Sequence, residues 1–148
     1  QVYCVVVYLA GVSGRFEFRV RWGDTDCTSR VYFTVYIRWI DDATTELLRG
    51  RGINYDSSGG LFLEGVKLNE TFVIGEYKCR IEKPSRFDDV IIVDVGVKEI
   101  RNRVAVFEGN LFDGITGDKL ASGGITYVCV DKSGKSTDIP ERLLKALK

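Results

Sequence analysis

Two carboxylates, Asp24 and Asp26, lie in the turn-rich residues 22–26, between a strand-like segment and a helix-like segment. Unpaired N–H groups and the helix dipole favour negative charge at the start of a helix. With an ordinary pKa of about 3.9, an aspartate in this place is ionised at pH 7 and can serve as a base or a nucleophile. The same helix end can hydrogen-bond a carbonyl oxygen, so acyl transfer is the favoured reaction. The alternative is that these aspartates only cap the helix or close a turn.

The chain contains no histidine, which narrows the possible chemistry. Ser-His-Asp and Cys-His catalysis and most catalytic metal sites depend on an imidazole. The base or nucleophile of an enzyme is then expected to be a carboxylate, a lysine, a tyrosine or an activated thiol.

The four cysteines, Cys4, Cys27, Cys79 and Cys129, are far apart and form no CxxC pair. Neither a zinc site nor a disulfide framework is therefore expected, and a reducing, cytoplasmic environment fits best. Buried thiols are the favoured interpretation. A disulfide between Cys79 and Cys129 is the alternative, if their strands are neighbours.

The composition is that of one globular domain of 148 residues, with 45% apolar and 28% charged residues. No run approaches the 18 or more apolar residues that a membrane span needs. Lys and Arg together number 21, as do Asp and Glu, so the net charge is zero. Because no global field gathers nucleic acid or an acidic membrane, neither is expected as a partner, and an anionic ligand requires a local cluster.

Two periodicities flank the carboxylates. Apolar and charged residues alternate over residues 16–22, which predicts a half-buried strand with Phe16, Phe18, Val20 and Trp22 on its apolar face. Apolar residues then recur at three- and four-residue spacing over residues 32–49. This spacing predicts one long amphipathic helix, which Thr28 or Ser29 caps and Gly50 or Gly52 ends.

The rest of the chain reads mostly as strands. After a polar, glycine-bearing loop at residues 52–60, strand-like runs cover residues 61–68, 71–82, 90–100, 104–112 and 125–130. A short helix is expected at residues 140–148, with Pro140 in its first position. The pattern predicts an α+β fold, in which an antiparallel sheet of about five or six strands wraps around one long central helix. Apolar surface left at a sheet edge favours pairing with a second copy.

The N-terminal residues are expected to form an extension at residues 1–14, ahead of the main domain at residues 15–148. Residues 2–10 are rich in Val and Tyr and are interpreted as an added strand. A secretory leader is disfavoured, because no basic segment precedes this run and no A-x-A-like site follows it.

The segment RVRWGDTDCTSRVYFTVYIRWIDDATTELL resembles the signature segment of the 4-hydroxybenzoyl-CoA thioesterase-like family of hotdog-fold proteins. KPSRFDDVIIVDVGVKEIRNR and ASGGITYVCVDKSGKSTDIPERLLKAL resemble the central strands and the closing strand of that family. The likeness runs from Phe16 almost to the end of the chain. It implies a hotdog fold and an acyl-CoA thioesterase that needs no cofactor and works as a homodimer or homotetramer.

The resemblance also implies site residues. Asp26 matches the catalytic aspartate, which attacks the thioester carbonyl or activates a water molecule, and Asp24 matches its non-catalytic neighbour. The backbone N–H of Phe33 matches the donor that polarises the carbonyl. Tyr32, Arg101 and Arg103 are the candidate substrate-binding residues, with the arginines, beside Lys98, expected near the phosphates of coenzyme A. For the arginines, a solvated hairpin tip is the alternative.

Three helix positions, Tyr36, Trp39 and Asp41, also follow the family pattern. Packing and helix orientation are the expected roles of these three side chains. Pro84, Arg86 and Asp88 also follow a family pattern and are interpreted as turn residues.

The chain departs from the family pattern at Ser29, where many relatives have glycine, at Phe33, where many have histidine, and at Val35, where asparagine is common. These changes keep open a second hypothesis, a non-catalytic acyl-CoA-binding or regulatory protein. A dehydratase of the same fold is disfavoured, because such relatives use an active-site histidine.

Overall fold

The centre of the computed structural model, which describes residues 7–9 and 11–148, is the helix α1 (Phe33–Gly50). One stripe of α1 is buried and consists of Val35, Tyr36, Trp39, Ile40, Ala43, Thr44, Leu47 and Leu48. These side chains recur every three or four residues, as the sequence predicts, and the helix lies within one residue of its predicted bounds. Gly52, with a φ of 75°, follows the C-terminal residue Arg51 and turns the chain away.

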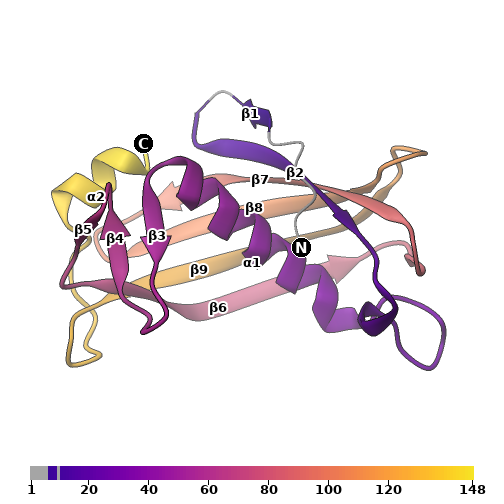
Figure 1. Cartoon of the computed structure of the whole chain (residues 1–148), viewed down its shortest axis with the longest axis horizontal. Helices are drawn as coiled ribbons and strands as arrows, with labels where there is room; N and C mark the ends of the chain where they lie inside the picture. Colours follow the sequence, from indigo (N-terminus) through magenta and orange to yellow (C-terminus); the bar gives the residue numbers. More distant parts are fainter. Residues whose placement is uncertain (1–6, 10) are drawn as a thin grey trace.

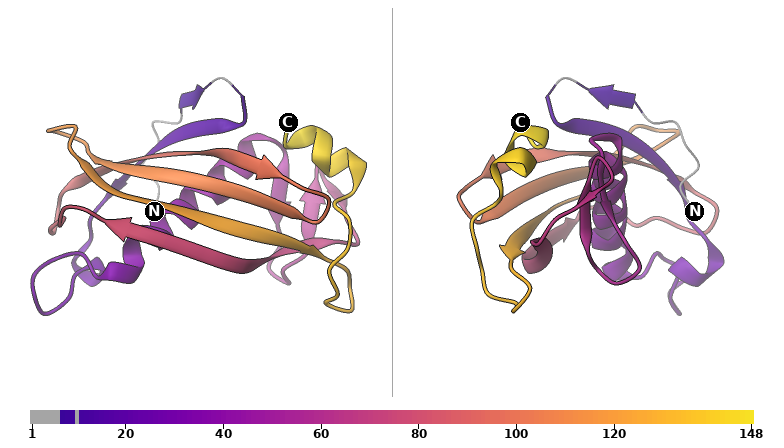
Figure 2. Two further views of the ribbon diagram at one scale, coloured as in Figure 1. Left: turned by 180° about the vertical axis from the view of Figure 1, so that it is seen from behind. Right: turned by 60° about the vertical axis from the view of Figure 1, so that its left-hand side comes forward.

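A six-stranded antiparallel sheet curves around α1 (Figures 1 and 2). Its order is β1-β2-β7-β8-β9-β6. The bounds are β1 (Val7–Leu9), β2 (Ser13–Arg19), β6 (Thr71–Ile81), β7 (Val90–Ile100), β8 (Val104–Asp113) and β9 (Lys119–Val130). The view from behind in Figure 2 shows the sheet lying across α1. The predicted hotdog architecture, a sheet wrapped around one long helix, is confirmed.

A second, three-stranded sheet follows α1 and corrects two predictions. Its strands are β3 (Ile53–Tyr55), β4 (Leu61–Leu63) and β5 (Val66–Lys67), in that order. The predicted loop at residues 52–60 therefore contains a strand, and the predicted strand at residues 61–68 is a tight hairpin. Its turn residues Glu64 and Gly65 both have positive φ values, 49° and 80°, which suit a two-residue hairpin loop.

The predicted strand at residues 16–22 ends earlier than expected. Phe16, Phe18 and Val20 are buried as predicted, but Trp22 is 75% exposed and belongs to a single 3-10 turn, η1 (Trp22–Asp24). The chain leaves the sheet here because the Asp24 carboxylate accepts a hydrogen bond from the Arg21 N–H at 2.8 Å. The Trp22 ring instead packs edge-on against Phe87, with 5.6 Å between ring centroids.

Strand β9 begins six residues before its predicted start, because Ser122, Gly123 and Gly124 have low strand propensity and hid it. A Cβ atom at Gly123 would lie 2.6 Å from the Lys78 carbonyl oxygen, so the close approach of β6 requires a glycine there. At the C-terminus, α2 (Glu141–Ala146) is shorter than predicted, and Pro140 is its N-cap residue.

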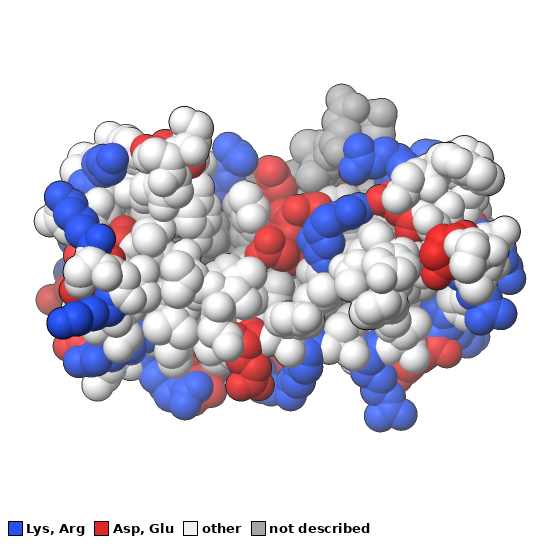
Figure 3. Space-filling model, turned by 90° about the horizontal axis from the view of Figure 1, so that it is seen from below, with Lys and Arg blue, Asp and Glu red and all other residues white. Residues whose placement is uncertain are grey.

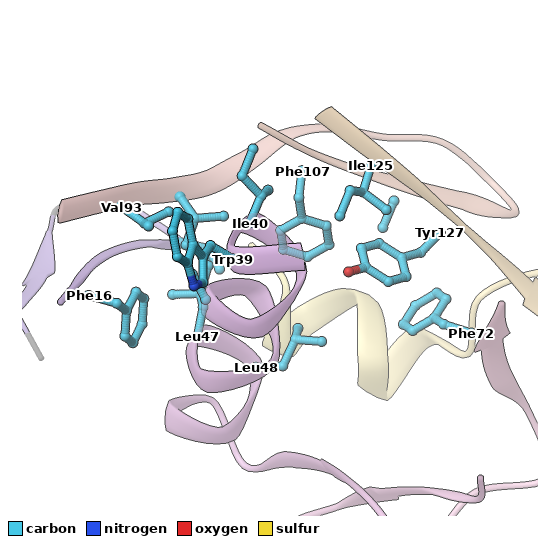
Figure 4. Close-up of a cluster of buried hydrophobic side chains, with 14 of the residues drawn as sticks. Phe16, Trp39, Ile40, Leu47, Leu48, Phe72, Val93, Phe107, Ile125 and Tyr127 are labelled. Carbon is cyan, nitrogen blue, oxygen red and sulfur yellow. The ribbon is translucent and has the colours of Figure 1, made fainter. Parts of the chain in front are cut away.

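The core lies between α1 and the sheet, where large side chains such as Phe16, Trp39 and Phe107 are fully buried (Figure 4). The β6–β9 register excludes the Cys79–Cys129 disulfide, because Cys79 lies opposite Gly123 and Cys129 opposite Phe72. At about 3.3 Å per residue, the two thiols are roughly 20 Å apart. Both are free thiols, as is the exposed Cys27. Cys4 lies outside the described residues.

The structure describes only part of the strand predicted at residues 2–10. Val7–Leu9 pairs with β2 as an edge strand, whereas residues 2–6 and 10 of the predicted strand lie outside the described residues. Whether residues 1–14 act as a separate extension stays a prediction. Among the described residues, no helix is both long and apolar enough to cross a lipid bilayer.

Candidate active site

Asp26 begins a tight five-residue loop that leads from η1 toward α1. Its Oδ1 atom accepts hydrogen bonds from the Thr28 N–H at 2.8 Å and the Thr28 hydroxyl at 2.6 Å. Its own N–H donates to the Arg30 carbonyl at 2.9 Å, which closes the loop. The hydrogen bonds from Thr28 hold the pKa of the Asp26 carboxyl below its ordinary value. The side chain is therefore fixed and ionised at neutral pH.

The same loop occurs twice more in the part of the chain that the structure describes. Asp56 and Asp131 accept hydrogen bonds from the N–H and hydroxyl groups of Ser58 and Ser133, the residues two positions later. The residue three positions after the aspartate has positive φ in all three loops. It is Gly59 or Gly134 (φ 83° in both) in these two and Ser29 (φ 63°) in the first. The local geometry of Asp26 is thus that of an ordinary turn, and its surroundings distinguish it.

Those surroundings are a pocket of about 300 Å³ at the N-terminal end of α1. Asp26 and Phe33 both line it, so the structure brings the two predicted catalytic positions together. The other lining residues are Thr28, Arg30, Val31, Tyr36 and Ile81, Glu82, Lys83 and Pro84. The sequence reasoning missed Thr28 and the wall after β6. The Asp-x-Ser/Thr spacing repeated at residues 26, 56 and 131 was the available signal for Thr28.

The start of α1 carries no side-chain cap. Its N-cap residue is Tyr32, which makes no capping hydrogen bond through its side chain. The prediction that Thr28 or Ser29 caps the helix is wrong, because the Thr28 hydroxyl is engaged by Asp26. The first N–H groups of α1, including that of Phe33, are therefore not covered by a capping side chain and remain suited to a ligand oxygen.

Asp24 fixes the helix start and does not line the pocket. It is 4% exposed, and its carboxylate accepts hydrogen bonds from the Arg38 guanidinium and the Arg21 N–H. Its carbonyl oxygen also accepts the Tyr32 N–H at 2.8 Å. Asp24 thereby ties the turn to both the N-cap and the second turn of α1, which is a structural role.

Tyr36 joins the pocket to the turn after β6. Its hydroxyl oxygen accepts a hydrogen bond from the Ser85 N–H at 3.1 Å, and the Ser85 carbonyl accepts the Val31 N–H at 2.8 Å. Trp39 is buried in the core, as expected for a packing residue. The rear of the pocket is therefore held to α1 by hydrogen bonds as well as by packing.

The predicted binding residues lie elsewhere within one chain. Arg101 and Arg103 are exposed in the turn between β7 and β8, where Arg103 pairs with Asp138 at 3.1 Å. This turn is at the opposite end of the sheet from the loop between β2 and α1 (Figure 1), about 33 Å away along the length of β7. Tyr32 is 44% exposed and lies outside the pocket lining, with its ring tilted against that of Phe33 at 4.6 Å between ring centroids.

No group of three or more Cys, Asp or Glu side chains among residues 7–9 and 11–148 could hold a metal ion.

Comparison with known proteins identifies the family of this chain. The model of the thioesterase-like superfamily matches residues 20–147. The chain belongs to this superfamily. A protein of Aquifex aeolicus that is named as an esterase is 30% identical over 133 residues, covering 90% of this chain and 96% of that protein. The expectation of a thioester hydrolase with a hotdog fold is thus confirmed at the level of the family.

Other members of the superfamily extend the likeness. The acyl-CoA thioester hydrolase YbgC of Escherichia coli is 27% identical over 117 residues, covering 79% of this chain and 81% of YbgC. The crystal structure of Slr0204, a 1,4-dihydroxy-2-naphthoyl-CoA thioesterase from Synechocystis, superposes with a TM-score of 0.79. It covers 91% of this chain and 95% of its own at 16% identity, a likeness of fold alone.

The three departures from the superfamily pattern differ in their consequences. Ser29 holds a left-handed backbone conformation that glycine adopts more easily, yet the loop keeps its hydrogen bonds. Phe33 is 60% exposed and contributes an aromatic ring to the pocket wall. Val35 is buried in the core stripe of α1, so the missing asparagine removes nothing from the pocket lining.

Proposed function

We propose that this protein hydrolyses an acyl-CoA thioester to a free acid and coenzyme A. The observation that carries the proposal is that an ionised aspartate, Asp26, and the uncapped N-terminus of α1 line one pocket. A thioester carbonyl in this pocket would meet a base or nucleophile on one side and a hydrogen-bond donor on the other. The matching names of relatives in the same superfamily support the acyl-CoA substrate.

In the proposed reaction, the Phe33 N–H donates a hydrogen bond to the thioester oxygen and stabilises the negative charge that forms on it. Asp26 acts in one of two ways. As a nucleophile it attacks the carbonyl carbon, expels the coenzyme A thiolate and forms an anhydride, which water then cleaves. As a general base it takes a proton from the attacking water, and that proton passes to the departing thiolate. Oxygen-18 entering Asp26 during a single turnover in labelled water would identify the nucleophilic route.

We further propose that a second copy completes the site. Strand β6 is a free sheet edge with exposed apolar side chains at Val73, Ile74 and Tyr77, and Figure 3 shows uncharged residues across much of this side. Unpaired edges of this kind favour strand addition. Antiparallel pairing about Tyr77 would set Glu76 of one copy opposite Lys78 of the other.

This pairing bears on the predicted binding residues. Antiparallel alignment reverses one sheet relative to the other, so the Arg101–Arg103 turn of one copy would come to the Asp26 end of its neighbour. The arginines could then meet the phosphates of coenzyme A while Asp26 meets the thioester. Within one chain, by contrast, the length of β7 places the two predicted groups about 33 Å apart, at opposite ends of the sheet.

The first test compares Asp26→Asn with Asp131→Asn, because Asp131 makes the same hydrogen bonds in a loop of the same kind. Release of free coenzyme A is followed with a panel of aliphatic and aromatic acyl-CoAs. Asp26→Asn is expected to lose roughly 10²–10⁴-fold in kcat/KM, whereas Asp131→Asn retains activity. Full turnover by Asp26→Asn would remove Asp26 from the mechanism. Binding without turnover by the unmodified protein would leave the non-catalytic acyl-CoA-binding hypothesis.

The second test mixes two inactive variants, Asp26→Asn and the double variant Arg101→Ala/Arg103→Ala, after unfolding and refolding them together. If the arginines act across the pair, each mixed dimer contains one fully intact site, and about a quarter of normal activity returns. If the arginines act within their own chain, every site carries one defect and activity stays low. The second result would overturn the shared site.

A further inference from the structure

A second pocket, of about 260 Å³, lies farther along the same side of α1. Asp41, Thr45 and Leu48 of α1 line it, together with Tyr55, Phe72, Ile74 and Tyr127. Phe33, Ile37, Asp41 and Thr45 recur every four residues and so form one stripe of the helix. At 1.5 Å per residue, Asp41 is about 12 Å from Phe33 along the axis. Each pocket is therefore lined by residues of both α1 and β6, one pocket toward each end of the helix.

This second pocket, the far pocket, contains a polar pair formed by a buried tyrosine and a partly buried aspartate. The Tyr127 hydroxyl donates a hydrogen bond to Asp41 Oδ1. Tyr127 is 5% exposed and packs edge-on between the rings of Phe72 and Phe107, at centroid distances of 6.2 and 5.4 Å. Figure 4 shows its hydroxyl pointing toward α1. Burial, and then the neighbouring Asp41 charge, raise the pKa of Tyr127, so this hydroxyl remains a donor at neutral pH.

The pair is not saturated with hydrogen bonds. Tyr127 is the only hydrogen-bond donor to the Asp41 carboxylate among the residues that the structure describes, so its Oδ2 atom keeps acceptor capacity. The Tyr55 side chain lines the same pocket from β3, and burial raises the pKa of this phenol as well. The far pocket therefore combines aromatic walls with one carboxylate acceptor and two protonated phenols.

We propose, resting on the function proposed above, that this pocket binds the far end of the acyl group and selects an acyl chain that carries a hydroxyl there. With the thioester carbonyl at the Phe33 N–H, such a chain spans about 12 Å to Asp41. A terminal hydroxyl donates to Asp41 and is met by the Tyr55 phenol. A terminal methyl leaves the carboxylate without a second donor, and a terminal carboxylate is repelled by it.

The test uses three thioesters of equal chain length, which differ only at the far end: decanoyl-CoA, ω-hydroxydecanoyl-CoA and the mono-CoA thioester of decanedioic acid. The unmodified protein is expected to show a kcat/KM for the hydroxyl-ended substrate at least about tenfold above the methyl-ended one, and lowest for the carboxylate-ended one. The variant Asp41→Leu is expected to reverse the order of the first two. Asp42→Leu, one position along the helix and outside the pocket lining, retains the normal order.

Tyr127→Phe provides a second variant of nearly equal volume that keeps the aromatic packing. It is expected to lower the ratio of kcat/KM for the hydroxyl-ended substrate to kcat/KM for the methyl-ended one. Equal rates on all three end groups, or an unchanged preference in Asp41→Leu that folds with a normal melting temperature, would overturn the assignment of the far pocket. No coenzyme A release from any thioester would instead reject the proposed function itself.

Discussion

At the scale of single residues, the pKa of Asp26 is lowered by a turn that occurs three times among the described residues. Its hydrogen bonds with Thr28 match those of Asp56 with Ser58 and of Asp131 with Ser133. The pKa of each of these three carboxyls is lowered, with the side-chain hydrogen bond as the largest cause. The turn keeps each of these carboxyls ionised at neutral pH. Of the three, only Asp26 lines the pocket at the N-terminal end of α1.

The lowered pKa of Asp26 predicts the pH dependence of activity. Protonation would remove the base or nucleophile, so kcat/KM should fall on the acid side only below the ordinary aspartate value of about 3.9. A chain without histidine has no imidazole to produce an inflection between pH 6 and 7. A pH–rate profile of kcat/KM measures this directly. An acid limb centred near pH 6 would contradict the assigned ionisation.

Ser29 predicts a change in stability. Its left-handed conformation costs an L-residue about 1 kcal/mol, partly offset by the greater unfolded-state entropy of glycine. Ser29→Gly is therefore expected to raise the free energy of unfolding by up to about 1 kcal/mol. The reciprocal change, Gly134→Ser in the equivalent position, should lower it by about 1 kcal/mol. Urea unfolding of both variants tests the pair, and stabilisation by Gly134→Ser would refute the argument.

At the scale of elements, the sequence predicted those whose apolar residues recur at a regular spacing. It did not predict those whose residues depend on contact with another strand. The period of α1 gave its bounds to within one residue. The start of β9 was hidden because Gly123 and Gly124 have no side chains that show a strand pattern, although close approach to β6 requires a glycine at position 123. Strand β3 was hidden because it is only three residues long and leads directly into the polar, glycine-bearing residues 56–60.

Gly123 also predicts an element-scale effect on stability. The Cβ atom of Gly123→Ala would lie 2.6 Å from the Lys78 carbonyl oxygen, and a backbone atom in a paired strand cannot move aside freely. A loss of about 1–3 kcal/mol in the free energy of unfolding is expected. Gly23→Ala is the control, because its Cβ atom meets no atom within 4 Å, and its effect should stay within about 0.5 kcal/mol. Thermal or urea unfolding measures the free energy of unfolding of both variants. A smaller loss in Gly123→Ala than in Gly23→Ala would contradict the prediction.

At the scale of the whole molecule, the sequence predicts that some residues of the candidate site lie together, but it does not predict where the others lie. Asp26 and Phe33 are seven positions apart, and a turn followed by a helix brings them to one pocket. Arg101 and Arg103 carry the same family resemblance, but the antiparallel sheet sends them to its other end. In the proposed pairing, these arginines reach a ligand only after two copies assemble, and such a contact has no signal in the sequence of one chain.

The β6 edge predicts how assembly and activity are linked. In the proposed pairing about Tyr77, the variant Tyr77→Lys sets two like charges face to face and should produce monomers with little activity. Ile115→Lys is the control, since Ile115 is 87% exposed in the turn between β8 and β9. Light scattering during gel filtration and coenzyme A release measure both properties. A fully active Tyr77→Lys monomer would argue against a shared site.

Because the same turn forms three loops in the described part of the chain, one of these loops can be exchanged for another. Residues 131–135 could replace residues 26–30 with four substitutions, Cys27→Lys, Thr28→Ser, Ser29→Gly and Arg30→Lys, and the closing hydrogen bonds would have the same donors and acceptors. Such a transplant keeps the aspartate and its backbone frame while exchanging every other side chain of the loop. It would separate what substrate choice owes to loop side chains from what turnover owes to the position of one carboxylate.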